Sequence, residues 1–393
     1  MRNVQPLYAD LNIGGLAVAN NGNITNARAL REELVERGCI FQSTTDTELF
    51  IQLTATSQKA GLKERFIDAL RQLEGAYAVV ALADGILIGA RDPVGIRPLV
   101  LGRFDGRPVL ASETCALDAI GAQYERDIEP GEMVWCTDDG VESHYMNPKR
   151  PKSRPCAFEY VYFARADSFV DGRSVYDARE NLGIILAEEH PVEADVVSPV
   201  PDTSTPAALG YAKTLGIDFE FGLIKNNYVG RTFIQPTQAV RDLDVSRKHA
   251  ANKARLEGKR VVLVDDSIVR GTTSRKVVNM VRAAGAREVH MRVASPPIKF
   301  PCFYGIDMPS REKLVGAHHS VEEIRDMIGV DSLGYLSIDG LYRALGFEGR
   351  DPHAPQLTDH YFTGDYPTRL TDQERKAAID ARELQLTFLA ESA

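Results

Sequence analysis

Two adjacent carboxylates, Asp265 and Asp266, follow four apolar residues at 261–264, and a segment rich in hydroxyls comes after them. The apolar run predicts a buried strand, so the carboxylates stand at its carboxyl end, where parallel α/β sheets bind ligands. Carboxylates at such an edge can hold the hydroxyls of a ribose, or Mg²⁺ through water. Arg270–Ser274 then opens a helix whose free N–H groups and hydroxyls suit a phosphate monoester. Gly271 lets the backbone approach that phosphate without a Cβ in between.

Taken singly, the same residues are also compatible with an ordinary polar turn in which Asp and Thr cap a helix. The full segment from Val261 to Ser274, with Thr272 and Thr273 ahead of Ser274, is far more specific. It resembles the signature with which type I phosphoribosyltransferases bind phosphoribosyl pyrophosphate (PRPP). We therefore interpret the segment as a PRPP site.

The elements around this segment alternate between strand and helix. Apolar strands are expected at 194–201, 259–264 and 289–294. Helices are expected at 205–215, ending at Gly216, and from Thr273 to Gly285. Strand–helix–strand order at this spacing predicts a parallel α/β sheet in the second half of the chain.

Residues 1–145 have a different pattern, with short strands and tight turns. Asp84-Gly85 and Asp105-Gly106 each stand between two apolar runs, which predicts two hairpins. Helices are expected from an Asn cap at Asn26 to Gly38 and at 47–57. These features predict an antiparallel sheet system. Three prolines within 145–158 indicate a linker, and 371–388 has the pattern of a final amphipathic helix.

Composition excludes several classes of protein. The 393 residues suggest two or three domains, and the net charge of −9 gives no overall attraction to nucleic acid or anionic lipid. No apolar run approaches the roughly 20 residues of a membrane span, and the start has no signal-peptide core. The five cysteines form no CxxC pair, so structural zinc and a disulfide framework are not expected and a reducing cytoplasm fits.

Segments along the whole chain resemble one family, the glutamine PRPP amidotransferases. The resembling segments are 21–26, 46–48, 89–98, 156–165, 199–204, 225–234 and 302–307. The resemblance implies an α+β N-terminal-nucleophile (glutaminase) domain at 1–147, incomplete at its start. An α/β type I phosphoribosyltransferase domain with a parallel sheet follows at 148–345, and a partly helical extension at 346–393.

The same resemblance implies a reaction in two halves, at the committed step of purine synthesis. Glutamine is hydrolysed in the first domain, and its ammonia displaces pyrophosphate from C1 of PRPP in the second, giving 5-phosphoribosylamine. The implied residues of the transferase half are Asp265 and Asp266 for ribose and Mg²⁺, Ser204 for the metal, Arg270 to Ser274 for the 5-phosphate, and Lys225, Tyr228 and Arg231 in a loop that closes over PRPP. In the glutaminase half, Asn21 and Gly22 are expected to form the oxyanion hole, and Asp46 to take the glutamine ammonium.

The sequence departs from the family pattern in two places. Met1 resembles a point inside the glutaminase domain, and the nucleophilic Cys that begins the mature family enzymes has no counterpart. We therefore expect the chain as written to depend on ammonia. Some members also carry a [4Fe–4S] cluster on four cysteines, of which only Cys156 and Cys302 are matched here. Thr358 and Tyr361 occupy the other two positions, so no cluster is expected.

Two alternatives remain open at this point. A phosphoribosyltransferase fold can sense PRPP without catalysis, as in some purine repressors, but no basic DNA-binding domain is visible. A salvage enzyme acting on a base would not need the segments at 1–140. For the amidotransferase, the resemblance implies purine nucleotides as feedback inhibitors, a homo-oligomer (a tetramer), a cytoplasmic location, and neither nucleic acid nor membrane as a partner.

Overall fold

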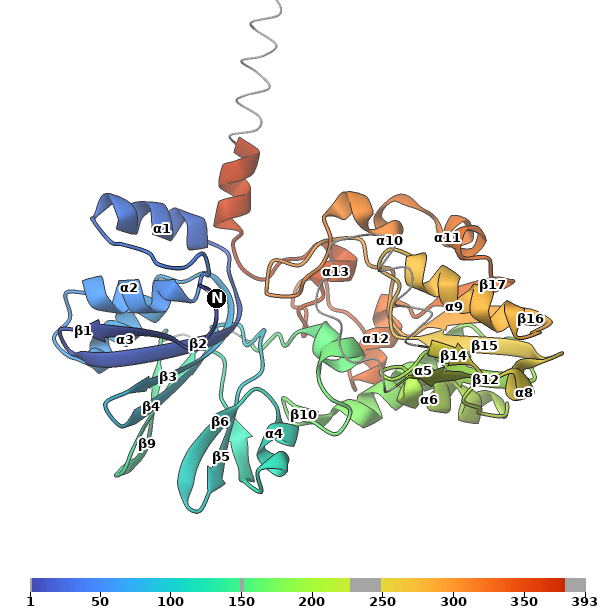
Figure 1. Cartoon of the computed structure of the whole chain (residues 1–393), viewed down its shortest axis with the longest axis horizontal. Helices are drawn as coiled ribbons and strands as arrows, with labels where there is room; N and C mark the ends of the chain where they lie inside the picture. The colour runs from blue at the N-terminus through green and yellow to red at the C-terminus, as the bar shows by residue number, and fades with distance from the viewer. Residues whose placement is uncertain (1, 149–151, 227–248, 379–393) are drawn as a thin grey trace, which may run out of the picture.

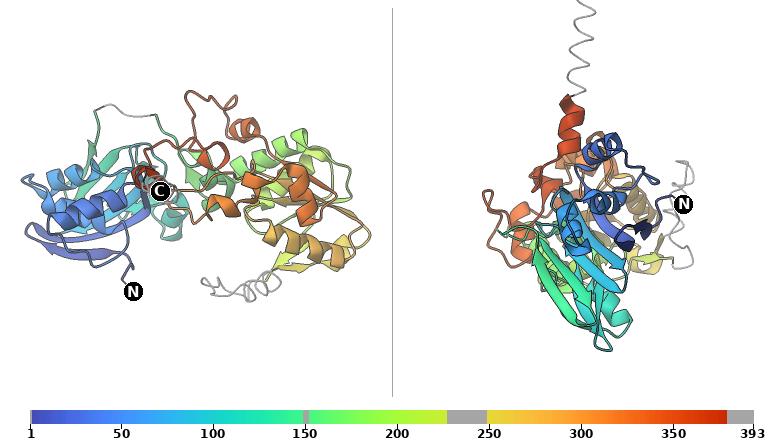
Figure 2. Two further views of the ribbon diagram at one scale, coloured as in Figure 1. Left: turned by 90° about the horizontal axis from the view of Figure 1, so that it is seen from above. Right: turned by 90° about the vertical axis from the view of Figure 1, so that its left-hand side faces the viewer.

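The computed structural model describes residues 2–148, 152–226 and 249–378, and two halves of different architecture lie side by side in it (Figure 1). Seen from above, the two halves occupy opposite ends of an elongated molecule (Figure 2). Within the described ranges no helix is long and apolar enough to cross a bilayer.

The first half is built on a six-stranded antiparallel sheet with a smaller sheet beside it. The large sheet has the order β1 (Leu7–Leu11), β2 (Gly14–Ile24), β3 (Gly75–Ala83), β4 (Ile86–Arg91), β8 (Glu132–Thr137) and β9 (Gly140–Tyr145). The small sheet has the order β6 (Arg107–Ala111), β5 (Val100–Phe104) and β7 (Gln123–Asp127). The helices are α1 (Ala27–Glu36), α2 (Glu48–Thr56), α3 (Leu62–Leu70) and α4 (Thr114–Ala119). Both predicted Asp-Gly hairpins are confirmed, because β3 pairs with β4 and β5 with β6 across these turns.

The second half is built on the predicted parallel sheet. Its strands have the order β12 (Val196–Pro199), β15 (Arg260–Asp265), β16 (Glu288–Val293) and β17 (Ser332–Tyr335). Apolar side chains of β12 and β15 alternate between two cores. One core holds α5 (Val175–Glu189), α6 (Thr205–Leu215) and α12 (Ile338–Ala344), and the other holds α9 (Thr272–Ala283) and α11 (Val321–Ile328). Helices therefore cover both faces and leave the carboxyl edge of the sheet for the site.

Shorter elements complete this half. They are a π-helix (Glu159–Phe163), β10 (Phe169–Val170), β11 (Arg173–Ser174), β13 (Leu223–Lys225), β14 (His249–Ala251), α8 (Lys253–Leu256), a 3₁₀ turn (Arg311–Lys313), α10 (Val315–His318) and α13 (His360–Thr363). The predicted C-terminal helix is seen at 371–378, and its remainder lies outside the described residues.

One helix cap was predicted wrongly. Asn26 precedes α1, but its side chain bonds the loop before β3 instead: Nδ2 donates to the carbonyl of Gln72, and Oδ1 accepts from the amide of Glu74. The cap comes from Asp372, whose carboxylate accepts from the amides of Arg28 and Ala29 at 2.7 and 3.0 Å. The C-terminal helix accordingly lies beside α1 in Figure 1.

Two ion pairs, each with a buried guanidinium group, join the halves. The Arg91 guanidinium, 1% exposed, contacts both carboxylate oxygens of Asp171 at 2.8 and 2.9 Å. Arg97 lies 2.9 Å from the carboxylate of Glu159, and both side chains are buried. The halves are therefore fixed to each other by buried charge as well as by apolar packing.

Candidate active site

The predicted PRPP segment lines a pocket of about 460 Å³ at the carboxyl edge of the parallel sheet. The residues that the sequence predicted and that line it are Asp265, Asp266, Arg270, Gly271, Thr272, Thr273 and Ser274. Gly271 has φ +73°, a left-handed conformation that favours glycine, and it stands immediately before α9. The first turn of α9 contains no acidic residue, and its residues Thr272, Thr273 and Ser274 line the pocket.

The two carboxylates differ in their partners. Asp266 accepts hydrogen bonds from the hydroxyls of Ser267, at 2.7 Å, and of Thr203. Asp265 accepts from the backbone amide of Asp266. Burial raises the pKa of both carboxyl groups; the charge of Asp266 raises that of Asp265 further, whereas the two hydroxyls and Arg179 oppose the rise at Asp266. Bringing a cation to this pair would relieve its buried negative charge.

Not every predicted transferase residue joins this pocket. Ser204 is buried, and its hydroxyl donates to the carbonyl of Val200, so it does not line the pocket. Lys225 ends β13 and pairs with Asp202. Tyr228 and Arg231 lie outside the described residues.

Sequence reasoning missed part of the pocket wall. Thr203 lines it, although the neighbouring Ser204 was chosen from the same motif. Three aromatic residues of the 156–165 segment also line it: Phe158, Tyr162 and Phe163. Residues 306–309 also line the pocket. The sequence offered one signal for the three aromatic side chains, which is the resemblance of the whole 156–165 segment to the family. That resemblance did not single out any of the three.

The predicted glutaminase residues lie on β2 and before α2. Asn21 lines a pocket of about 250 Å³ between the two sheets of the first half, and its Oδ1 accepts from Arg97 Nη2 at 2.9 Å. Gly22 requires glycine, because a Cβ there would lie 2.1 Å from the carbonyl oxygen of Ala76. None of the chain's five cysteines lines this pocket.

Asp46 lies in a different pocket, of about 530 Å³, which it shares with Asn23 and Arg31. Its carboxylate accepts from the amide of Ile24 at 2.8 Å. Burial raises its pKa, and the hydrogen bonds from Ile24 and Thr45 oppose the rise. The described residues therefore do not bring Asn21 and Asp46 into one cavity.

The residues at the family's cluster position do not fit a [4Fe–4S] cluster. The Tyr361 hydroxyl lies 3.1 Å from Cys156 Sγ and 3.7 Å from Cys302 Sγ, so the phenol fills the space between the thiols. Thr358 is paired with Cys156 through the backbone. Burial raises the pKa of the Cys156 thiol to about 12, which favours the thiol over the iron-binding thiolate.

Comparison with known proteins agrees with the two halves. Residues 1–119 match the family model described as a glutamine amidotransferase domain, and 167–295 match the phosphoribosyl transferase domain. The amidophosphoribosyltransferase of Rhizobium etli is 59% identical over 95% of this chain and 76% of its own length. That of Bacillus subtilis is 50% identical over 94% and 77%. The Bacillus subtilis structure titled as the PRPP amidotransferase complexed with ADP and GMP superposes with a TM-score of 0.88, at 49% identity, over 94% of this chain and 81% of that one.

A glutamine amidotransferase domain joined to a phosphoribosyltransferase domain defines a class of enzymes that transfer the nitrogen of glutamine to PRPP. The chain belongs to the amidophosphoribosyltransferase family, enzymes of purine biosynthesis. It is therefore a pentosyl transferase, and the alternative of a PRPP sensor without catalysis is not favoured.

Proposed function

We propose that PRPP binds in the pocket between β15 and α9, where ammonia displaces pyrophosphate from C1. Asp265 and Asp266 hold the ribose hydroxyls, and Arg270 with the first turn of α9, Thr272 to Ser274, holds the 5-phosphate. The observation that carries this proposal is that one pocket combines a buried carboxylate pair with a helix N-terminus free of acidic residues. The Mg²⁺ that accompanies the pyrophosphate group suits the carboxylates, and the 5-phosphate suits the helix N-terminus.

The carboxylate pair also supports Mg²⁺ as the cofactor. Mg²⁺ prefers oxygen ligands and is usually held by one or two carboxylates together with substrate phosphates. Asp265 and Asp266 supply two such carboxylates, and the described residues contain no larger group of His, Cys, Asp and Glu suited to a metal. When bound, Mg²⁺ neutralises charge on the leaving pyrophosphate. Lys225, near the same edge, is proposed to add a second positive charge.

In the first half, we propose that Asn21 and Gly22 donate to the oxyanion formed when glutamine is attacked, and that Asp46 receives the glutamine ammonium. The side-chain amide of Asn21 lines its pocket, which supports the first role. Burial of Asp46 against a pocket that also holds Asn23 supports the second.

The remaining family properties are also proposed for this chain. The limits 1–147, 148–345 and 346–393 for its three parts are compatible with the matched ranges. Inhibition by purine nucleotides is supported by the Bacillus subtilis relative, whose structure was solved with ADP and GMP. We further propose a homo-oligomer, a tetramer, in the cytoplasm.

The test is the double substitution D265N/D266N, which keeps the shape of the pair and removes its charge. We expect ammonia-dependent release of pyrophosphate from PRPP with Mg²⁺ to fall by about 10²-fold or more, the scale for losing a preorganised electrostatic partner. The matched control is D195N/D331N, whose carboxylates cap the opposite ends of β15 and β16 by accepting from Arg260 and Val289 amides. Near-normal activity of D265N/D266N would refute the site.

A further inference from the structure

Arg97 connects the two candidate sites through a single buried side chain. Its Nη2 donates to Asn21 Oδ1 at 2.9 Å in the first half, and its Nη1 lies 2.9 Å from Glu159 Oε1 in the second. Arg97 belongs to the 89–98 segment and lines neither of the two candidate pockets. Both the proposed oxyanion residue and the transferase half therefore depend on the position of one guanidinium.

On the glutaminase side, Arg97 decides which way the Asn21 amide faces. A guanidinium only donates hydrogen bonds, so the amide atom that faces it is the carbonyl oxygen. The NH₂ group of Asn21 then faces away from Arg97. The positive charge of Arg97 beside Oδ1 also polarises the amide and makes the NH₂ protons better donors. An oxyanion hole needs this orientation and not the reverse.

On the transferase side, Arg97 holds the π-helix that walls the PRPP pocket. Glu159 begins this helix, and its last residue, Phe163, lies with its ring centroid 5.9 Å from the Arg97 guanidinium carbon. Phe163 and Tyr162 line the pocket that contains Asp265. A single π-helical turn is a common feature of functional sites. Displacing Glu159 would therefore move pocket-lining aromatic rings.

The halves make further contacts at the same boundary. Asn23 Nδ2 donates to the carbonyl of Phe303 at 2.9 Å. A Cβ on Gly305 would lie 2.8 Å from the carbonyl group of Gly22, so the two backbones touch at the proposed oxyanion residue. The residues that follow Gly305 in the chain, 306–309, line the PRPP pocket. The boundary around Arg97 is thus shared by both sites.

The Arg97–Glu159 pair is poorly arranged for stability alone. Arg97 Nε and Nη1 and Glu159 Oε1 are buried and form no hydrogen bond with suitable geometry among the described residues. Buried donors without hydrogen bonds reduce stability, and a buried ion pair often stabilises no more than an apolar pair of similar volume. Positioning explains the pair better than stability does.

We propose that Arg97 is a positioning residue for both halves of the reaction: it orients the Asn21 amide and, through Glu159, fixes the aromatic wall of the PRPP pocket. This inference rests on the proposed roles of Asn21 and of that pocket. It makes PRPP occupancy and the geometry of Asn21 interdependent.

Three variants and one control test this. E159Q removes the negative charge of the pair and keeps its shape. R97K keeps the positive charge but lacks the guanidinium fork, and R97M/E159L replaces the pair by apolar side chains. The control is D171N, the same carboxylate-to-amide change in the other ion pair between the halves; Asp171 lines neither candidate pocket. The left-handed φ of +45° at Asp171 is one that Asn tolerates.

The first measurement is ammonia-dependent pyrophosphate release in the full chain, with the melting temperature recorded for each variant. We expect the KM for PRPP to rise about tenfold in E159Q, R97K and R97M/E159L. D171N is expected to keep the wild-type KM. The melting temperature of R97M/E159L is expected to equal or exceed that of E159Q. The KM for PRPP is expected to stay raised in R97M/E159L all the same, which would separate the KM defect from a loss of stability.

The second measurement follows the Asn21 side-chain NH₂ signals in protein labelled with ¹⁵N-asparagine, assigned with N21D. Adding PRPP and Mg²⁺ is expected to shift these signals in wild type and D171N, and not in E159Q or R97M/E159L. Normal KM values and unchanged PRPP-induced shifts in the Arg97 and Glu159 variants would overturn the inference. Absence of pyrophosphate release from wild type would instead refute the proposed function.

Discussion

His360 is a titratable side chain held where its charge has no compensation. It is fully buried between the rings of Tyr304, Tyr361 and Tyr366, and neither ring nitrogen has a hydrogen-bond partner among the described residues. Burial, together with the positive charge of Arg154, lowers its pKa to about 3. The imidazole is therefore neutral in the folded protein at any physiological pH.

This pKa predicts a loss of stability in mild acid. Between pH 6.5 and 3 the unfolded chain binds a proton at His360 and the folded chain does not, so stability falls as pH falls through that window. The contribution lost between pH 7 and pH 5 is about 2 kcal/mol. H360F, which keeps a ring of similar size, should lack this component, so urea unfolding at both pH values should show a smaller decrease than wild type. An equal decrease in both proteins would contradict the pKa assignment.

At this scale the sequence predicted residues that are contiguous and missed those that depend on a distant partner. Asp265, Asp266 and the first turn of α9 could be found because one strand–loop–helix segment places them all. Thr203 and Ser204 are equivalent in sequence, and only the start of α6 decides that Thr203 reaches Asp266 while Ser204 turns to Val200. Arg97 could not be assigned, because Glu159 comes from the other half.

At the scale of elements, periodicity and turn residues predicted the strands and helices well. The αL cap at Gly216 and the Asp-Gly hairpins are local features, and they are as expected. The cap of α1 was wrong because local competition decided it: the Asn26 side chain is occupied by the loop before β3, and a carboxylate from the end of the chain takes its place. A helix cap that is supplied by a distant residue leaves no signal in the local sequence.

The α1 cap predicts the effect of D372A. Losing an N-cap carboxylate that receives two backbone amides should cost about 1 kcal/mol and expose those amides. Hydrogen exchange at Arg28 and Ala29 should therefore become faster, and the urea midpoint should fall slightly. The control is E374Q in the same segment, whose surface pair with Arg369 should contribute little. Unchanged exchange at both amides in D372A would contradict the assignment.

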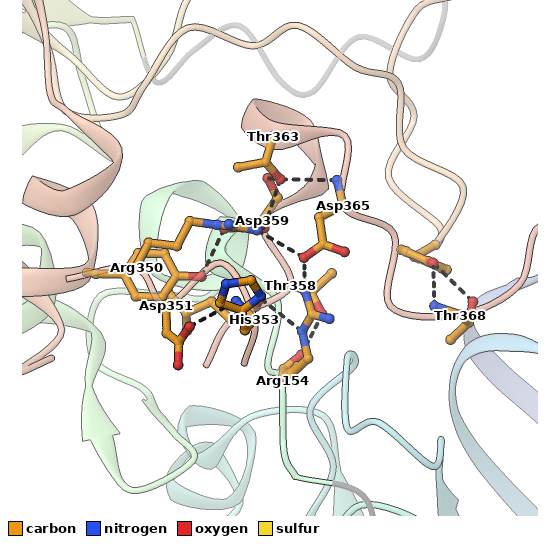
Figure 3. Close-up of polar contacts among 12 residues, drawn as sticks. Arg154, Arg350, Asp351, His353, Thr358, Asp359, Thr363, Asp365 and Thr368 are labelled. Carbon is orange, nitrogen blue, oxygen red and sulfur yellow. Dashed lines mark hydrogen bonds and ion pairs between the residues drawn. The ribbon is translucent and has the colours of Figure 1, made fainter. Parts of the chain in front are cut away.

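At the scale of the whole molecule, the C-terminal extension is fastened to both halves. Figure 3 shows Arg350 reaching Asp359 and Asp365, with Arg154 also contacting Asp365. This network holds the segment that carries Tyr361 against Cys156 and Cys302. Further along the extension, the carbonyl of Arg369 accepts a hydrogen bond from the hydroxyl of Thr25, which belongs to the first half. The extension thus links the halves.

Because the Tyr361 phenol fills the space between the thiols of Cys156 and Cys302, we expect the protein to bind no iron–sulfur cluster. Protein purified without oxygen should contain no stoichiometric iron and show no broad visible absorption. T358C/Y361C restores cysteine at both missing positions and removes the phenol, so it serves as the positive control after reconstitution with iron and sulfide. About four irons per wild-type chain would show that the expectation is wrong.

The reach of Asp372 to α1 also orders events during synthesis. The carboxylate and the Arg28 amide that it caps are 344 residues apart in the chain. At about 5–20 residues per second, a ribosome needs roughly 20–70 s to make that stretch. Throughout that interval α1 stays uncapped, so its final stabilisation is a late event that waits until Asp372 has been made.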